Sequence, residues 1–320
     1  MADIVVEKAT IDDHDSILAI TKDEVLWGGT DYLPHCLNNW LTEANTPGSN
    51  RENFKVTVSD RVIGFTSVYY INNRSVGLKF AFRVSSSVRG QGYGREISRL
   101  LNDRLRNSGV ESVISAIPNI DMTDEELRSP KLGTLLTAPA FSSFTLRNSQ
   151  LKHDLIVKKN LPEVDRDSFA DLLKKKKLVH LFENNVVHMN WVSVTPETDD
   201  DVEFAVRKRQ VVLMDDNHQS LSILTLPFPV PGGIRTTIDF YSDDEALLED
   251  HILHQLHNLR NSLEASEDDD IILVSIVSRE SFKESVENVT KKIGLVKDNM
   301  GKFGSQKREF GKMYVYKKEL

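Results

Sequence analysis

Three glycines and an arginine stand close together between residues 84 and 101, where an apolar stretch runs through a turn into an amphipathic pattern. Gly90, Gly92 and Gly94 let the backbone turn sharply and approach a ligand, because no Cβ shields their amide groups. A helix that begins at about Gly92 would direct its unpaired N–H groups and its positive dipole end at the same place. Arg89 adds a fixed positive charge. The segment therefore predicts a cradle for the pyrophosphate of a nucleotide.

Two other phosphate-binding loops fit this segment poorly. The G-x-x-x-x-G-K-[ST] loop of nucleoside triphosphatases needs a Lys followed by Ser or Thr, and neither pair follows these glycines. The dinucleotide fingerprint G-x-G-x-x-G has a different spacing and follows the first strand of its unit, whereas two or three strands are expected before this turn. A nicotinamide-dependent oxidoreductase is therefore disfavoured. A glycine-rich turn without a ligand is the alternative interpretation.

Length and charge restrict the class of protein. The 320 residues exceed the ~100–200 residues of one typical domain, so two domains are expected. A net charge of −8 disfavours nucleic acid and anionic membranes as partners. The first residues are partly acidic and no long apolar run occurs, so we expect neither a signal peptide nor a membrane span and predict a soluble, cytoplasmic protein. The single cysteine, Cys36, fits a reducing compartment and is interpreted as a buried or incidental thiol rather than a nucleophile.

Alternating strands and helices are expected around the glycine turn. The expected strands cover residues 4–8, 54–58, 62–71, 76–85, 110–117 and 141–146. Helices are expected over about 10–20, around Leu37 to Leu41, after Gly92, and over 123–128, where Thr123 and Glu126 stand at capping-box spacing. The turn thus follows an antiparallel run of strands and leads into a helix.

The second half has a similar order of elements without the glycine turn. Strands are expected at 179–182, 211–214, 221–226, 234–241, 271–277 and 313–316, and helices at 168–175, 243–263 and 281–293. At the place of the glycine turn the chain has Asp243, Asp244 and Glu245, which would cap a helix but repel a pyrophosphate. We therefore expect the second half to repeat the fold without a nucleotide site.

The arginine and two of the glycines form the pattern R-x-x-G-x-G, which resembles the coenzyme A loop of the GNAT superfamily of N-acetyltransferases. The order of elements over the first half resembles that fold as well. The resemblance implies an α+β fold, with a mixed, mostly antiparallel sheet flanked by helices. It implies a GNAT acetyl-CoA-binding catalytic domain at 1–150, a connector at 151–178 and a degenerate GNAT-like domain at 179–320. The coenzyme A contacts that it implies are Val84, Arg89, Gly90, Gln91, Gly92, Tyr93 and Gly94.

Two further stretches resemble the histidine N-acetyltransferase group within this superfamily. They are residues 20–40, with the pattern G-x-D-Y-L-P at 29–34, and residues 126–136. This resemblance implies acetyl transfer from acetyl-CoA to the amino group of a small molecule, such as the free amino acid histidine. The implied mechanism is direct attack by a neutral amine on a thioester held between the fourth and fifth strands, near Val84 and Ala116.

The proton-transfer groups of such enzymes are missing from their usual positions. Relatives carry a carboxylate near Phe80 and a tyrosine in the helix after the fifth strand, whereas residues 79–83 read K-F-A-F-R and no tyrosine occurs from 121 to 146. The catalytic residues are therefore unknown, with Asp31 and Tyr32 as candidates. Asp31 could hold a substrate ammonium and Tyr32 could pack on the substrate or donate a proton. An Asx turn beside a core aromatic residue explains the same pair equally well.

Arg83 is a further candidate for substrate binding, because it would hold a substrate carboxylate if it faced the cleft. A surface-facing side chain is the favoured alternative. The missing acid and base also leave a second hypothesis for the whole chain, a non-catalytic coenzyme A sensor or scaffold. His251, His254 and His257 recur every three residues and could approach one metal ion, but a polar helix stripe is favoured, and we expect no metal. The oligomeric state is not indicated.

Overall fold

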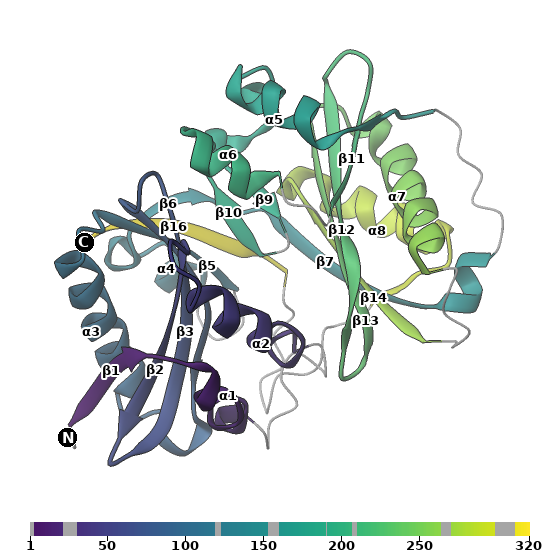
Figure 1. The fold of residues 1–320 in the computed structure, drawn as a ribbon. Coiled ribbons are helices and arrows are strands. Elements are labelled where there is room, and N and C mark those ends of the chain that lie inside the picture. Colours follow the sequence, from purple (N-terminus) through teal and green to yellow (C-terminus); the bar gives the residue numbers. More distant parts are fainter. Residues whose placement is uncertain are drawn as a thin grey trace.

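The computed structural model describes residues 3–21, 31–118, 123–152, 160–189, 191–206, 210–263, 270–297 and 311–320. These residues form two seven-stranded mixed sheets and a two-stranded hairpin. Each large sheet dominates one half of the molecule (Figure 1). The predicted fold class, α+β with mixed sheets and helices on their faces, is confirmed.

The first sheet has the strand order β1-β2-β3-β4-β5-β16-β6. The strands are β1 (Ile4–Lys8), β2 (Arg51–Val58), β3 (Arg61–Ile71), β4 (Val76–Val84), β5 (Ser112–Pro118), β16 (Met313–Glu319) and β6 (Thr134–Thr137). Helices α1 (His14–Leu18) and α2 (Leu33–Ala44) bury Ile17 and Leu37 with Phe65 of β3. Helix α3 (Tyr93–Asn107) buries Leu101 with Val68. Neighbouring residues of β3 point to opposite faces, so the sheet is covered on both sides.

Strands β4 and β5 form the one parallel pair of this sheet, and they part before they end. Val76 to Lys79 pair with Ser112 to Ser115, and no pairing continues beyond Lys79 although β4 runs to Val84. The pairing of β4 with β3 also shifts its register near Ala81, whose φ of 54° marks a bulge. The bulge bends β4 away from β5 and opens a split between the two strands.

The second sheet has the order β15-β7-β14-β13-β12-β11-β8. The strands are β15 (Val296–Lys297), β7 (Ala140–Arg147), β14 (Ile271–Ser278), β13 (Gly233–Ser242), β12 (Ser220–Val230), β11 (Gln210–Met214) and β8 (Glu163–Val164). Helices α7 (Leu248–Leu263) and α8 (Lys283–Lys292) bury Leu256 and Val286 with Ile238 of β13. The parallel unit β13-α7-β14 repeats the unit β4-α3-β5.

The two sheets exchange strands. Strand β7, expected as the final strand of the first unit, pairs with β14 in the second sheet, so its expected place is wrong. The last strand in the chain, β16, pairs with β5 and β6, and its yellow ribbon lies among the strands of the first half (Figure 1). Apolar patterning predicts that a segment is a strand but does not determine its neighbours. The domain limits at 150 and 178 remain a prediction, and neither sheet follows them.

The remaining elements lie between and beside the sheets. They are α4 (Asp124–Leu127), α5 (Arg166–Lys174), α6 (Asp199–Ala205), and a hairpin of β9 (Val187–Met189) and β10 (Val192–Val194). The strand expected at 179–182 is wrong, because Val179–Leu181 form a 3-10 turn. That turn buries Leu178 and Leu181, three residues apart, and exposes Val179. Three-residue spacing suits a helical turn, whereas a strand buries every second residue.

One hydrophobic cluster joins the two halves. It contains Leu78 and Ile114 of the first sheet together with Ile223 of β12, Phe169 of α5 and Phe204 of α6. The halves therefore share a core rather than meeting through a polar interface. Within the described part of the chain, no helix is long and apolar enough to cross a membrane.

Candidate functional site

The predicted cradle is formed by the turn between β4 and α3. Gly90 and Gly92 have φ values of 74° and 85°, in the left-handed region that favours glycine, and Gly92 is the N-cap of α3. A Cβ at either position would meet no atom within 4 Å, so the side of the turn that a side chain would fill is open. The first N–H groups of α3 lack partners within the helix and are available to an anion. The turn therefore fits the pyrophosphate of coenzyme A.

Arg89 stands at the edge of this turn. Its Nε donates a hydrogen bond of 2.9 Å to the carbonyl of Val84, which fixes the guanidinium beside the end of β4. The side chain of Gln91 donates to the carbonyl of Ser87, and Tyr93 packs against the core under α3. The side chains of Gln91 and Tyr93 thus make contacts within the protein, and only their backbone atoms are left for a ligand in the turn. Their predicted contacts with the coenzyme remain predictions.

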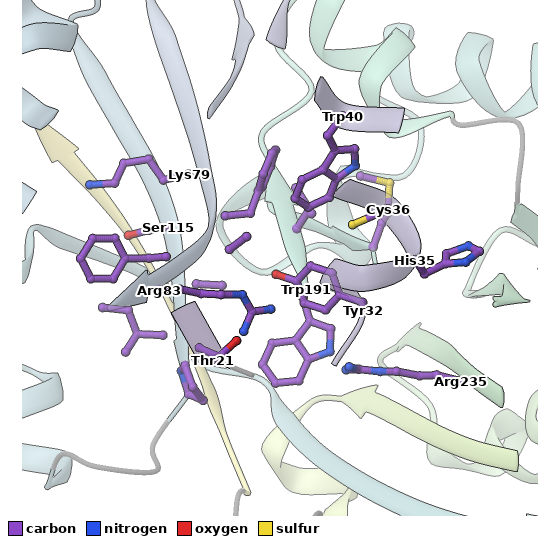
Figure 2. Close-up of a pocket in the computed structure, with 18 of the residues that line it drawn as sticks. Thr21, Tyr32, His35, Cys36, Trp40, Lys79, Arg83, Ser115, Trp191 and Arg235 are labelled. Atoms are coloured by element: carbon purple, nitrogen blue, oxygen red, sulfur yellow. The ribbon is translucent and has the colours of Figure 1, made fainter. Parts of the chain in front are cut away.

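A cavity of about 1010 Å³ runs from the cradle through the split between β4 and β5 to the space between the two halves. Of the predicted coenzyme contacts, Val84, Arg89, Gly90 and Gly94 line it, and Gln91, Gly92 and Tyr93 do not. Ala116 also lines the cavity, as expected for the split. The second half completes the wall with Met189, Trp191, Val192, Gln210, Thr225, Leu226, Phe228 and Arg235. The cavity therefore extends from the cradle to a side to which both halves contribute. Around that side, Figure 2 shows Arg83 and Tyr32 of the first half with Trp191 and Arg235 of the second.

Arg83 faces this cavity, so the expectation of a surface-facing side chain is wrong. The residue is 7 % exposed, and its Nη2 donates to Oδ1 of Asp31 at 2.5 Å. Its guanidinium lies 5.6 Å from the centre of the Tyr32 ring. Its Nε is buried and has no hydrogen-bond partner among the described residues. The bulge at Ala81 explains this orientation, because an extra residue in a strand changes the face to which later side chains point.

Asp31 and Tyr32 lie at the start of α2. Oδ1 of Asp31 accepts the backbone N–H of Leu33 at 3.0 Å, so the Asx turn is present. The ring of Tyr32 packs against that of Trp40, with the two ring centres 6.0 Å apart, and Tyr32 lines the cavity. Burial raises the pKa of the Tyr32 phenol, which therefore keeps its proton at neutral pH. A role of Asp31 in holding an ammonium, and of Tyr32 in contacting the substrate or donating a proton, remains a prediction.

Arg235 of β13 is a charged residue of the cavity that the sequence analysis missed. It is 2 % exposed, and its guanidinium lies 5.4 Å from the centre of the Trp191 ring. Burial lowers its pKa to about 10, so it is charged at neutral pH. The signal in the sequence was a lone arginine in a strand that reads G-I-R-T-T-I-D-F-Y-S. Arginine is rarely buried without a partner or a function. Nothing in the sequence of the strand indicates that a cavity lies beside Arg235, so the residue was missed.

Two more cations line the cavity from the first half. Arg51 is held by Glu43 and by Ser67, each at 2.8 Å, and its guanidinium packs 4.6 Å from the ring of Trp40. Lys79 donates a hydrogen bond of 3.1 Å to Oδ1 of Asn102. Among the described residues that line the cavity, none is Asp or Glu. The cavity wall therefore has a net positive charge and suits anionic ligands, although Asp31 and Glu43 beside the wall pair with Arg83 and Arg51.

Two other side chains of α2 in the cavity wall are poor candidates for catalysis. Burial raises the pKa of Cys36 to about 12, so its thiol is not ionised at neutral pH and is a poor nucleophile. This fits the expected buried thiol. The ring of His35 stacks 5.6 Å from that of Phe228, and its imidazole points away from Tyr32 and Trp191 (Figure 2).

The strand exchange brings two tyrosines beside β5, where related enzymes were expected to have one nearby. Tyr314 and Tyr316 of β16 pair with Ile117 and Ser115. Both are buried in a cluster with Leu127 of α4, and the Tyr316 hydroxyl donates to the Leu127 carbonyl. Neither lines the cavity. These tyrosines therefore pack α4 against β16 outside the cavity wall.

Of the three histidines expected to form a polar stripe on α7, His254 and His257 are half-buried, and His251 departs from the expectation. His251 is fully buried, and its two ring nitrogens lie 2.8 and 2.9 Å from the hydroxyls of Ser222 and Ser220. It therefore holds α7 on β12 through a buried polar network. In the part of the chain that the structure describes, no group of three His, Cys, Asp or Glu residues could hold a metal ion.

Comparisons with known families agree with this geometry. Residues 3–120 match the family described as acetyltransferase (GNAT) domain, and residues 157–269 match the family described as histidine N-acetyltransferase, C-terminal. Similar proteins include the histidine N-acetyltransferases of Scomber australasicus, 24% identical over 80% of this chain and 79% of that protein, and of Xenopus tropicalis, 23% identical over 72% and 74%. The predicted resemblance to the GNAT superfamily is confirmed.

Solved structures resemble the whole chain in fold. An N-myristoyltransferase of Saccharomyces cerevisiae with bound myristoyl-CoA has a TM-score of 0.57 at 10% identity, over 99% of this chain and 83% of that one. A tandem GNAT protein from the clavulanic acid biosynthesis pathway has a TM-score of 0.55 at 13% identity, over 99% and 98%. The fold is thus that of two GNAT-like units in tandem.

Proposed function

We propose that this N-acetyltransferase has a free amino acid, such as histidine, as its acceptor. The proposal follows from the combination of a match to the GNAT acetyltransferase domain with a match to the histidine N-acetyltransferase C-terminal region. The acetyl donor is acetyl-CoA, and the acceptor reacts through its amino group. One observation carries the proposal: two buried arginines, Arg83 from the first sheet and Arg235 from the second, lie close to the same tyrosine in the cavity wall.

The two arginines suit the carboxylate of such an acceptor. The positive charges of Arg83 and Arg235 both act on the Tyr32 phenol, where they oppose the rise of its pKa through burial. Charge-assisted hydrogen bonds from guanidinium groups to a carboxylate are strong, and the burial of both arginines strengthens them further. A carboxylate placed between the two groups orients the neighbouring amino group toward the split.

The split supplies the donor side of the reaction. The cradle at Gly90 to Gly94 and Arg89 hold the pyrophosphate of the coenzyme, and Val84 and Ala116 flank the path of its arm. In the reaction, the neutral amine forms a C–N bond with the acetyl carbonyl and the C–S bond breaks. The attacking nitrogen loses one proton to solvent or a cavity group and keeps the other as the amide N–H, and the released sulfur takes one proton. Bringing both reactants into one cavity supplies much of the rate increase.

A screen of acceptors tests the proposal. The protein is mixed with acetyl-CoA and each free amino acid, and thiol release and the mass of the acetylated product are measured. We expect turnover with at least one amino acid, and an increase of KM by roughly 10-fold or more when its carboxylate is replaced by an amide, because a charge-assisted hydrogen bond is lost. Equal KM values for the acid and the amide would overturn the carboxylate site. Tight acetyl-CoA binding without turnover of any amine would instead support the sensor hypothesis.

A further inference from the structure

The split between β4 and β5 has a second side, away from the arginines, and Lys79 lies there. In Figure 2 its amino group points away from Arg83 and Tyr32, on the other side of β4. Lys79 and Ser115 are the last residues that pair before the two strands part, and both line the cavity. Ser98 of α3 lines this side too. Lys79 therefore marks the closed end of the split.

The closed end is where the sulfur of the coenzyme is expected. The cradle lies at the open end, after Val84, and Lys79 stands five residues before Val84 on β4, a path of at most about 16 Å at 3.3 Å per residue, which the bulge at Ala81 shortens. The arm that joins the pyrophosphate of coenzyme A to its sulfur is of similar length when extended. Coenzyme bound in the cradle with its arm in the split would therefore bring its sulfur near Lys79, deeper in the split than the position near Val84 that the sequence predicts.

The thiolate that leaves the acetyl group needs a proton there. The described residues of the cavity wall include no carboxyl group, and the tyrosine among them, Tyr32, lies on the other side of β4. Lys79 is held in place by the hydrogen bond from its Nζ to Asn102 of α3. We propose that Lys79 is the catalytic acid that protonates the thiolate of coenzyme A, and that Asn102 is its positioning residue. One N–H bond of the ammonium breaks, an S–H bond forms, and the neutral amine regains a proton from solvent.

The electrostatic surroundings of Lys79 suit this role. Burial, and secondly the charge of Lys318 on β16, lower its pKa to about 8. An acid works best when its pKa is close to the working pH and to that of the group it protonates, and an ordinary thiol has a pKa near 8.5. At neutral pH the side chain is therefore still an ammonium, but it gives up a proton more easily than an exposed lysine. Its hydrogen-bond partner, Asn102, is neutral.

The first test uses free coenzyme A and needs no acceptor, so it can fail independently of the proposed function. The ultraviolet absorbance of the thiolate is followed against pH with coenzyme A bound to the wild type and to Lys79→Gln. A neighbouring ammonium stabilises a thiolate, so we expect the apparent pKa of the bound thiol to be lower in the wild type by about one unit or more. Equal thiol pKa values in the two proteins, with coenzyme bound to both, would overturn the proposal.

The second test measures turnover against pH. In Lys79→Gln we expect kcat to fall by roughly 10²–10⁴-fold with the affinity for acetyl-CoA little changed, because general acid catalysis has this range. Activity of the wild type should fall as pH rises above about 8, when Lys79 loses its proton, and this alkaline limb should be absent from the variant. A kcat within about 3-fold of the wild type would contradict the proposal.

Neighbouring residues supply the controls. Lys318→Gln removes a positive charge near Lys79, so it should keep kcat at neutral pH and move the alkaline limb to higher pH. Asn102→Ala should lower kcat less than Lys79→Gln while acetyl-CoA still binds. Lys79→Met keeps the apolar stem in the wall, and thermal melting of each variant separates loss of the acid from loss of the fold. If Lys79→Met melts like the wild type and retains full activity, Lys79 is not the acid.

Discussion

The two halves of the molecule contain the same β-α-β unit, and its connecting turn differs between them. In β4-α3-β5 the turn has glycines with positive φ and leaves the first N–H groups of α3 available. In β13-α7-β14 the turn has Asp243 and Asp244. Oδ1 of Asp244 accepts the N–H of Ala246 at 2.9 Å, and Asp243 pairs with Arg279. In the second turn, an N–H group at the start of the helix is therefore bonded to a carboxylate of the turn itself. In the first turn, N–H groups at the same place remain available to a ligand.

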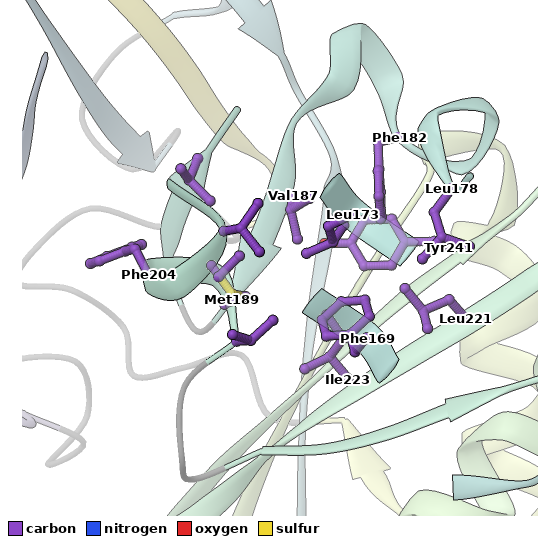
Figure 3. Packing of buried hydrophobic residues seen from close by; sticks show 14 of the residues in the cluster. Phe169, Leu173, Leu178, Phe182, Val187, Met189, Phe204, Leu221, Ile223 and Tyr241 are labelled. Carbon is purple, nitrogen blue, oxygen red and sulfur yellow. The ribbon is translucent and has the colours of Figure 1, made fainter. Parts of the chain in front are cut away.

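The space beyond the parallel strands differs as well. The end of β13 is covered by β9, where the Tyr241 hydroxyl bonds to the backbone N–H and carbonyl of His188 at 2.7 and 2.8 Å. Phe182 and Val187 pack into the same cluster with Tyr241 (Figure 3). The second half thus lacks an open split there. It contributes instead to the cavity of the first half, through Arg235 and Trp191. In the proposed function, the first unit would bind the donor, and the second would help to shape the acceptor side.

The largest expected effect comes from closing the cradle. Gly92→Val places a β-branched side chain at φ 85° and in the space above the turn. We expect acetyl-CoA affinity to fall by roughly 100-fold or more, because two charge-assisted hydrogen bonds would be lost. Isothermal titration with acetyl-CoA measures this. Gly294→Val, at φ 82° and also in open space, is the matched control in the second half and should bind acetyl-CoA normally. Retained binding by Gly92→Val would show that the cradle is elsewhere.

A smaller effect is expected at the acceptor side. Arg235→Gln should raise KM for the amino acid by roughly 10–100-fold, since one charge-assisted hydrogen bond is removed, and should leave KM for acetyl-CoA unchanged. Steady-state kinetics with each substrate varied in turn measures the two constants. Arg279→Gln removes the arginine that pairs with Asp243 in the second half and serves as the control. An unchanged KM for the amino acid in Arg235→Gln would show that Arg235 of the second half does not contribute to the acceptor site.

The acidic turn of the second half should matter for stability alone. Asp244→Ala removes a cap and should lower the free energy of unfolding by about 0.5–2 kcal/mol, with acetyl-CoA affinity unchanged. Urea denaturation and titration calorimetry measure the two quantities. Weaker acetyl-CoA binding in this variant would show that the second half holds part of the coenzyme.

The smallest effect is expected at the exchanged strand. Tyr316→Phe removes the hydrogen bond to the Leu127 carbonyl and should lower the free energy of unfolding by about 1 kcal/mol. Because Tyr316 does not line the cavity, kcat at neutral pH should stay within about 2-fold of the wild type. Denaturation and turnover assays on the same preparation measure both. A large loss of kcat in a well-folded variant would make Tyr316 a competitor of Lys79 as the acid.

Local features were predictable from the sequence because neighbouring residues alone produce them. The glycine turn starts α3 at the expected place, since its conformation depends on Gly90 and Gly92 themselves. The capping box is also confirmed, with Glu126 accepting from the N–H of Thr123 at 2.7 Å and the Thr123 hydroxyl accepting the N–H of Glu126. Most strands and helices follow their apolar periodicity, and residue spacing therefore determined the elements and the glycine turn.

Tertiary structure alone decided which residues of the two halves line the cavity together and which strands pair. Arg83 turns into the cavity because of the bulge at Ala81, and Arg235 reaches it only because the second sheet packs beside the first. Strands β7 and β16 exchange sheets although their patterns are those of ordinary strands. These features depend on contacts between residues far apart in the chain, and the periodicity of a segment records which of its faces is buried but not what covers it.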